Sequence, residues 1–218
     1  MCGICGELRF DGASPDRDAI QRMSEKMARR GPDHAGLFTD GPLAFGHRRL
    51  AIIDLSASAD QPMVDAAIQL ALVFNGTIYN YRKLRVELIA MGYAFFSEGD
   101  SEVILKAYHA WGEACVQRFY GMFAFGIWDT RHASLFLARD RFGIKPLYLA
   151  QDGQRLRFAE MSDQSFPFHN EIAALANALV DQVFAYLDDP KALAAHMGES
   201  SMMMAGSRMS IEIGRAHV

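Results

Sequence analysis

Apolar residues along the first 160 positions follow two different periods. Where they recur every three or four positions, an amphipathic helix is predicted, and this holds for residues 16–30, for the stretch from Tyr81 to Gly92 and for residues 100–111. Short continuous apolar runs predict strands at residues 2–10, 43–53, 68–74, 122–128, 134–138, 147–150 and 156–158. Because the strands come in groups instead of alternating one for one with helices, the pattern predicts an α+β fold with antiparallel sheets.

The pattern changes after residue 160. Residues 161–218 contain six of the twelve methionines and a single lysine. Helices are predicted over residues 171–187 and 190–197, whereas residues 200–210 are low in complexity and have no clear period. We therefore expect residues 1–160 to form the functional domain and residues 161–218 to be a non-native or poorly ordered tail.

Composition narrows the class of protein. Half of the 218 residues are hydrophobic and 22% are charged, which allows a packed core. The net charge of −4 argues against a nucleic-acid partner, and the absence of a long apolar run argues against a membrane span. Three cysteines, without a secretory signal at the N-terminus, argue for a reducing compartment. We therefore expect a globular cytoplasmic protein.

Cys2 is the first candidate for chemistry. Removal of Met1 would place a thiol and an α-amine on the same residue, and an amine with a pKa of about 8 is a base that can take the thiol proton. A buried structural cysteine is the commoner meaning of such a position. Cys2 and Cys5 also form a CxxC pair, which could be redox-active or bind a metal. In a strand, however, residues three apart point to opposite faces.

Asn75 and Gly76 follow an apolar strand and allow two interpretations. Asn-Gly is a common hairpin turn. The same pair can form an oxyanion hole, in which an Asn side-chain N–H and a backbone N–H converge on a developing negative charge. The residues alone leave both possibilities open.

Two charged residues are ambiguous in the same way. Arg49 could bind a substrate carboxylate with two hydrogen bonds, or it could close a structural salt bridge. Asp100 could cap the helix that begins there, or it could bind a substrate ammonium group. His47 is expected to be a hydrogen-bonded structural histidine, because the α-amine already supplies a base.

Eight sequence blocks stand in a fixed order along the first 160 residues. They are MCGICG at 1–6, RRGPD at 29–33, GHRRLAIIDLS at 46–56, QPM at 61–63, FNGTIYN at 74–80, SEGDSEVIL at 97–105, GMFAFGIWD at 121–129 and LARDRFGIKPLYL at 137–149. Taken together, these blocks resemble the class II glutamine amidotransferase domain, the N-terminal half of glutamine-dependent asparagine synthetases. The match extends to about residue 160, and it also resembles the N-acetylglutaminylglutamine amidotransferase branch of that family.

The resemblance implies a four-layer αββα sandwich of two antiparallel sheets, the fold of N-terminal nucleophile hydrolases. It implies that Cys2 attacks the side-chain amide of glutamine, forms a thioester and releases ammonia. Asn75 and Gly76 match the oxyanion-hole positions. Arg49 matches the position that binds the α-carboxylate of glutamine, and Asp100 the position that binds its α-amine. No metal is implied in this domain.

Two departures from the family pattern accompany the resemblance. Thr77 stands where the family commonly has a glutamate beside the glutamine site, so weaker substrate binding is expected. The Ser-Gly-Gly-x-Asp-Ser pattern of the synthetase domain does not occur. ATP and magnesium are therefore expected only for that missing domain, which would be the partner of this one, and a homodimer is a further possible assembly.

Two other functions remain open from the sequence. The first is an inactive fragment that acts only as a docking partner, and the second is a CxxC redox or metal-binding protein.

Overall fold

The computed structural model of the protein describes residues 1–161 and 208–212. Its helices are α1 (Arg17–Lys26), α2 (Tyr81–Ala90) and α3 (Asp100–Trp111), with the short 3-10 segments Ala57–Ala59 and Gly112–Arg118. Its strands are β1 (Gly3–Arg9), β2 (His34–Asp40), β3 (Leu43–Arg49), β4 (Met63–Asp65), β5 (Leu70–Ile78), β6 (Gly121–Asp129), β7 (Ser134–Arg139), β8 (Tyr148–Asp152), β9 (Arg155–Ala159) and β10 (Arg208–Glu212).

The described strands form two five-stranded sheets. Sheet A has the order β2-β3-β1-β9-β8, and sheet B has the order β10-β7-β6-β5-β4. Every strand pairing is antiparallel. The α+β class predicted from the strand pattern is therefore confirmed.

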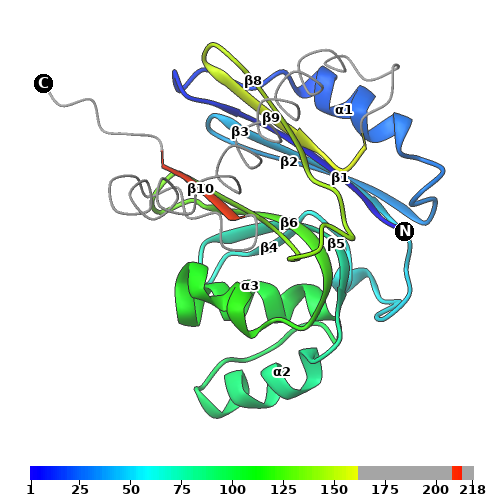
Figure 1. Ribbon diagram of the computed structural model, residues 1–218, viewed down its shortest axis with the longest axis vertical. Helices are drawn as coiled ribbons and strands as arrows, with labels where there is room; N and C mark the ends of the chain where they lie inside the picture. Colours follow the sequence, from blue (N-terminus) through cyan, green and yellow to red (C-terminus); the bar gives the residue numbers. More distant parts are fainter. Residues whose placement is uncertain (162–207, 213–218) are drawn as a thin grey trace, which may run out of the picture.

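The sheets and helices stack in four layers (Figure 1). Helix α1 covers the outer face of sheet A, and α3 covers the outer face of sheet B with α2 packed on it. Between the two sheets lies an apolar core that includes Ile4, Phe45, Val73, Trp128 and Phe158. Two further apolar clusters join α1 to sheet A and the helices α2 and α3 to sheet B. This αββα arrangement is the one that the family resemblance implies.

Helix α1 shows how the sequence sets the local structure. Its N-cap is Asp16, whose side chain accepts a hydrogen bond from the Ala19 backbone N–H and so satisfies one of the free donors of the first turn. Ile20 and Met23, one turn apart, are buried against sheet A. The predicted helix over residues 16–30 is therefore present, but it is shorter at its C-terminal end.

Strand β5 corrects one expectation. It continues to Ile78, so Asn75 and Gly76 lie inside a strand that pairs with β6, with Gly76 opposite Phe123. A hairpin turn at Asn75-Gly76 is therefore wrong. Strands β2 and β4 have no counterpart among the predicted strands, because β2 is a largely exposed edge strand and β4 is only three residues long.

The C-terminal segment is described only in part. The helices predicted over residues 171–187 and 190–197 lie outside the described residues. Strand β10 pairs with β7 at the edge of sheet B, from Arg208 opposite Ala138 to Glu212 opposite Ser134. No sequence pattern predicts this strand. Among the described helices, none is long and apolar enough to cross a membrane.

Candidate active site

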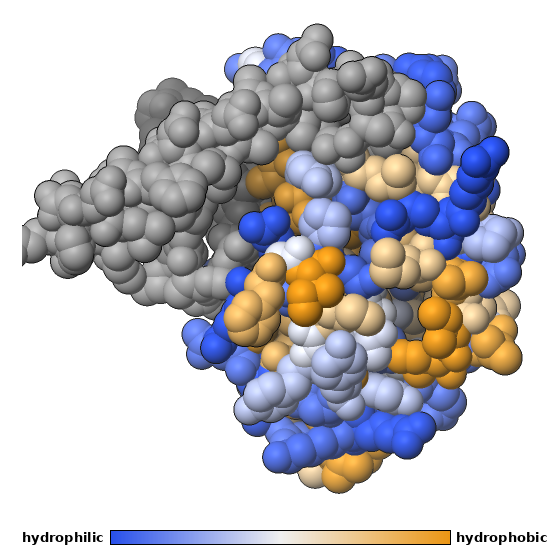
Figure 2. Space-filling model, turned by 45° about the vertical axis from the view of Figure 1, so that its right-hand side comes forward, coloured by the Kyte–Doolittle hydropathy of each residue, from blue (hydrophilic) through white to orange (hydrophobic). Residues whose placement is uncertain are grey.

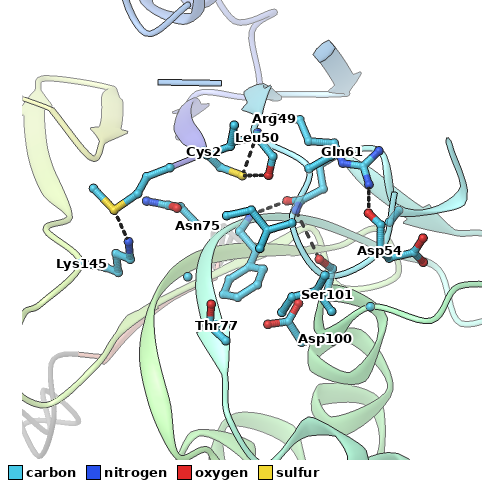
Figure 3. Close-up of a pocket in the computed structure, with 18 of the residues that line it drawn as sticks. Cys2, Arg49, Leu50, Asp54, Gln61, Asn75, Thr77, Asp100, Ser101 and Lys145 are labelled. Carbon is cyan, nitrogen blue, oxygen red and sulfur yellow. Dashed lines mark hydrogen bonds between the residues drawn. The ribbon is translucent and has the colours of Figure 1, made fainter. Parts of the chain in front are cut away.

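The six residues predicted to act on a substrate meet in one cleft at an end of the stacked sheets (Figure 3). The N-terminus of β1 and the end of β3 supply one side of the cleft, while β5 and the start of α3 supply the other. Because β1 and β3 pair antiparallel, the start of β1 lies beside the end of β3, with Gly3 opposite Arg48. The residues that line the cleft include Cys2, Arg49, Asn75, Gly76, Thr77 and Asp100.

The Cys2 thiol is held at the cleft by the backbone of Leu50. The sulfur accepts a hydrogen bond from the Leu50 N–H at 3.4 Å and donates one to the Leu50 carbonyl oxygen at 3.6 Å. Burial raises the pKa of the Cys2 thiol, although the contact with Leu50 partly opposes this effect. The thiol is therefore protonated at neutral pH and needs a base before it can act as a nucleophile.

Cys5 does not share this environment. Its thiol is fully buried and donates weak hydrogen bonds to the carbonyl oxygens of Ile20 in α1 and Gly46 in β3. Cys5 therefore faces α1, whereas Cys2 faces the cleft. The two thiols are not placed to act as a CxxC pair.

The open edge of β5 provides a backbone donor for the cleft. Strand β4 pairs with β5 only as far as Leu72, which leaves the edge beyond it without a neighbouring strand. The Phe74 N–H donates to Gln61 Oε1 at 2.6 Å, and the Ile78 N–H donates to Asp100 Oδ2 at 2.9 Å. Alternate residues of a strand present their N–H groups to the same edge. The Gly76 N–H therefore points to this edge as well, between the other two.

Gly76 cannot be replaced by a larger residue without moving its neighbours. A Cβ atom at this position would lie 2.2 Å from the Met122 carbonyl oxygen and 2.7 Å from the Phe123 Cα. Its φ of 156° also falls in the range that glycine adopts more readily than other residues. The glycine thus lets β5 and β6 approach closely while its N–H faces the cleft.

Arg49 forms structural contacts and also lines the cleft. Its guanidinium group is buried and donates to the carbonyl oxygens of Ser56 and Asp54 and to the Asp60 carboxylate. The expected structural salt bridge is therefore present. A guanidinium group has five N–H donors, so two remain for another acceptor in the cleft.

Asp100 does not cap α3. The N-cap residue is Gly99, and α3 begins at Asp100 without a side-chain cap. The Asp100 carboxylate instead reaches across to the Ile78 backbone N–H and lines the cleft. Burial raises its pKa to about 6. A cationic group bound beside it would favour the ionised form. Thr77 lies close by in the cleft and adds no charge (Figure 3).

The structure adds polar residues that the motif analysis leaves without a role. Gln61 fixes the edge of β5 through Phe74 and donates to the Ser101 hydroxyl group at 3.3 Å. Glu160, directly after β9, accepts a hydrogen bond from Asn75 Nδ2 at 2.5 Å and forms an ion pair with Arg30. Arg30 also donates to the Cys2 carbonyl oxygen at 3.4 Å. In the sequence, Gln61 is marked only by the QPM block, and Glu160 only by the short Phe-Ala-Glu sequence at 158–160.

His47 is hydrogen-bonded, as expected from the sequence. Its Nε2 atom lies 3.2 Å from the Phe74 carbonyl oxygen, and its side chain is fully buried. Burial lowers its pKa to about 3, so the imidazole is neutral at physiological pH. It does not line the cleft.

Comparison with known proteins decides the family. The family model described as a glutamine amidotransferase domain matches residues 1–216. The chain belongs to this family. Its match includes the segment after residue 160, for which the sequence alone predicts a tail outside the domain.

Curated relatives agree with this assignment. Glutamine-hydrolyzing asparagine synthetase 1 of Bacillus subtilis is 36% identical over 201 residues, which cover 90% of this chain and 32% of the relative. A putative glutamine-hydrolyzing asparagine synthetase of Mycobacterium bovis is 46% identical over 158 residues, covering 68% of this chain and 24% of the relative. The amidotransferase chain thus spans about a third or less of the length of these relatives.

A solved structure supports the fold. Glutamine phosphoribosylpyrophosphate amidotransferase from B. subtilis superimposes with a TM-score of 0.60 at 22% identity, covering 73% of this chain and 42% of that chain. The four-layer arrangement predicted for an amidotransferase domain is therefore confirmed. The narrower N-acetylglutaminylglutamine branch stays a prediction.

Proposed function

We propose that this amidotransferase domain hydrolyses the side-chain amide of glutamine to glutamate and ammonia. The observation that carries the proposal is the common cleft in which the Cys2 thiol faces the Asn75 side chain and the open edge of β5 at Gly76. Arg49 and Asp100 line the same cleft, so it offers a cation and an anion. Glutamine carries the opposite pair of charges on its α-carbon and an uncharged amide at its far end.

The chemistry follows from the protonated state of Cys2. Removal of Met1 would leave the Cys2 α-amine beside its own thiol, where it can accept the thiol proton. The sulfur then forms a bond to the amide carbon, and the oxyanion is stabilised by N–H groups of Asn75 and Gly76. The α-ammonium returns the proton to the leaving nitrogen, ammonia departs, and a glutamyl thioester remains. Water then attacks the thioester, which yields glutamate and the free thiol.

The charged residues determine where the substrate sits. The two free N–H donors of Arg49 suit the α-carboxylate of glutamine, because a guanidinium group can bind a carboxylate through two hydrogen bonds. The Asp100 carboxylate suits the α-ammonium group, which would keep Asp100 ionised despite its burial. Thr77 can contribute a hydroxyl or backbone contact but no second negative charge near the ammonium group.

The test is glutamate release from glutamine by the purified chain with Met1 removed. Cys2→Ala should abolish release, whereas Cys5→Ala should retain it, because Cys5 faces α1 and not the cleft. Mass spectrometry of the purified protein establishes whether Met1 is absent. Glutamate release that persists in the Cys2→Ala protein would overturn the proposed mechanism.

The proposed partner is the synthetase portion present in the longer relatives, which would use ATP and magnesium and consume the ammonia. The loops after β3 and β7 both contribute residues to the lining of the cleft, and each carries an exposed apolar side chain, Leu55 at 75% and Phe142 at 89% exposure. Figure 2 shows apolar groups gathered on one face of the molecule. Sedimentation of Phe142→Ser tests this surface: a dimer of the chain that dissociates on this change would show that a second copy covers it instead.

A further inference from the structure

Glu160 is a buried acidic residue that contacts Asn75 of the proposed oxyanion hole directly. It is 1% exposed and lies directly after β9, where its backbone N–H donates to the Ile4 carbonyl oxygen of β1 at 3.2 Å. One carboxylate oxygen pairs with the Arg30 guanidinium group. The other accepts a hydrogen bond from Asn75 Nδ2 at 2.5 Å. Glu160 thus joins the end of sheet A to the Asn75 side chain of sheet B.

The contact matters because an Asn side chain has two unlike ends. Its nitrogen carries two N–H donors and its oxygen only accepts, and a rotation of about 180° about the last side-chain bond exchanges them. An ionised carboxylate accepts hydrogen bonds but donates none. Next to ionised Glu160, the Asn75 amide must therefore present its nitrogen, and one of the two N–H groups remains for a second acceptor.

We propose that Glu160 is a positioning residue that fixes the Asn75 amide with its nitrogen directed inward, so that the second N–H can stabilise the oxyanion. The proposal rests on the proposed glutaminase function. With the amide reversed, Asn75 would bring its oxygen toward the developing negative charge, which is repulsive. Glu160 itself makes no contact with the substrate in this role and acts only through Asn75.

Protonation of Glu160 would remove this constraint. Burial raises the pKa of Glu160 to about 7, although Arg30, Asn75 and Lys145 oppose the effect. Cys2 and Cys5 are the thiols that face it, and their own pKa values are raised in part by its charge. As the pH falls through about 7, the carboxyl gains a proton and can donate to the Asn75 oxygen. Glu160 then no longer fixes the orientation of the Asn75 amide, and the rate of glutamine hydrolysis should fall.

Glu160→Gln is the sharpest substitution. The new side chain has the same shape but only one acceptor oxygen, for which the Arg30 guanidinium group and the Asn75 N–H compete. Because Arg30 has no acceptor, the glutamine must turn its oxygen to Arg30 and its NH₂ group to Asn75. Asn75 then has to present its own oxygen. Glu7→Gln is the matched control, since Glu7 is equally buried in sheet A and pairs with Arg157 away from the cleft.

Steady-state kinetics of glutamate release should separate positioning from general stability. Glu160→Gln should lower kcat roughly ten- to hundredfold, the range for one hydrogen bond to a charged group, while KM changes by less than about twofold. The Cys2 α-amine and Asp100 should cause declines in kcat/KM with falling pH in both proteins. The additional decline near pH 7 in the unchanged protein should be absent from Glu160→Gln, so the ratio of the two kcat/KM values should change with a midpoint near pH 7. Glu7→Gln should leave kcat and the pH profile unchanged.

A double-mutant cycle with Asn75→Ala provides the second arm. If Glu160 acts through Asn75, Glu160→Gln should reduce kcat by no more than about twofold once the Asn75 amide is gone. An equal reduction in both backgrounds would overturn the proposal. So would a Glu160→Gln protein whose kcat and pH profile match those of Glu7→Gln.

An observation that does not depend on activity distinguishes failure of this proposal from failure of the proposed function. The side-chain NH₂ signals of Asn75, assigned in ¹⁵N NMR spectra by their absence in Asn75→Ala, should shift with a midpoint near pH 7. The shift should be lost in Glu160→Gln. Signals that do not titrate would overturn the positioning role, while absent Cys2-dependent glutamate release with intact titration would overturn the function alone.

Discussion

The two sheets contribute different parts of the cleft. Sheet A brings the thiol of Cys2, the cation of Arg49 and the carboxylate of Glu160 to the ends of three neighbouring strands. Sheet B brings the Asn75 side chain and the Gly76 backbone from β5, and the Asp100 carboxylate from the helix that covers it. Neither sheet contains the proposed nucleophile together with the proposed oxyanion donors. The proposed chemistry therefore depends on how the sheets are packed on each other.

The packing between the sheets is apolar and includes one aromatic side chain that contacts both. Phe158 of β9 lies edge-on to Phe45 with ring centroids 5.8 Å apart. Its ring fills the space where Gly6 of β1 and Gly126 of β6 lack side chains, with a Cβ at Gly6 falling 2.3 Å from the ring. Phe158 also stands two residues before Glu160. Phe158 therefore belongs both to the core between the sheets and to the strand that leads into Glu160.

If the cleft depends on the packing between the two sheets, Phe158→Ala should have the largest effect on stability and activity together. Removing a buried aromatic ring should lower the free energy of unfolding by about 3–5 kcal/mol, and it should also lower kcat in the protein that remains folded. Leu88→Ala is the control, because Leu88 is fully buried between sheet B and its helices, away from the contact between the sheets. Urea unfolding and glutamate release measure the two quantities. If both variants lose stability but retain the same kcat, packing between the sheets does not set the geometry of the cleft.

The fold was predictable from the sequence because its strands are apolar runs and its helices have a regular period. The site was not predictable in the same way. Residue types alone left Asn75-Gly76 as a turn or an oxyanion hole and Asp100 as a cap or a ligand, and only the ordered blocks of the family resemblance favoured the second option in each case. They meet in one cleft because the two sheets pack on each other, which brings Asn75 of sheet B near Cys2 and Arg49 of sheet A.

Glu160 shows why a part of the site was missed. Its hydrogen bond to Asn75 joins residues 85 positions apart, and its partner Arg30 lies in the loop after α1. A short Phe-Ala-Glu sequence carries no period or spacing that indicates either contact. Arg49 illustrates the opposite case, because the sequence offered a salt bridge and a substrate ligand as alternatives. The structure shows the salt bridge and places the same residue at the cleft, so the substrate role stays a proposal.

A smaller effect is expected at Arg49, because this residue of sheet A is proposed to bind the substrate and not to take part in the chemistry. Arg49→Met should raise KM for glutamine roughly ten- to hundredfold, the cost of losing charge-assisted hydrogen bonds, with a smaller change in kcat. Asp60→Asn is the matched control, since it removes the charge that Arg49 pairs with but leaves the guanidinium group in the cleft. An equal rise in KM for Asp60→Asn and Arg49→Met would contradict the binding role. Arg49 would then act by holding the loop after β3 through Ser56 and Asp54, and another cation would bind the α-carboxylate of glutamine.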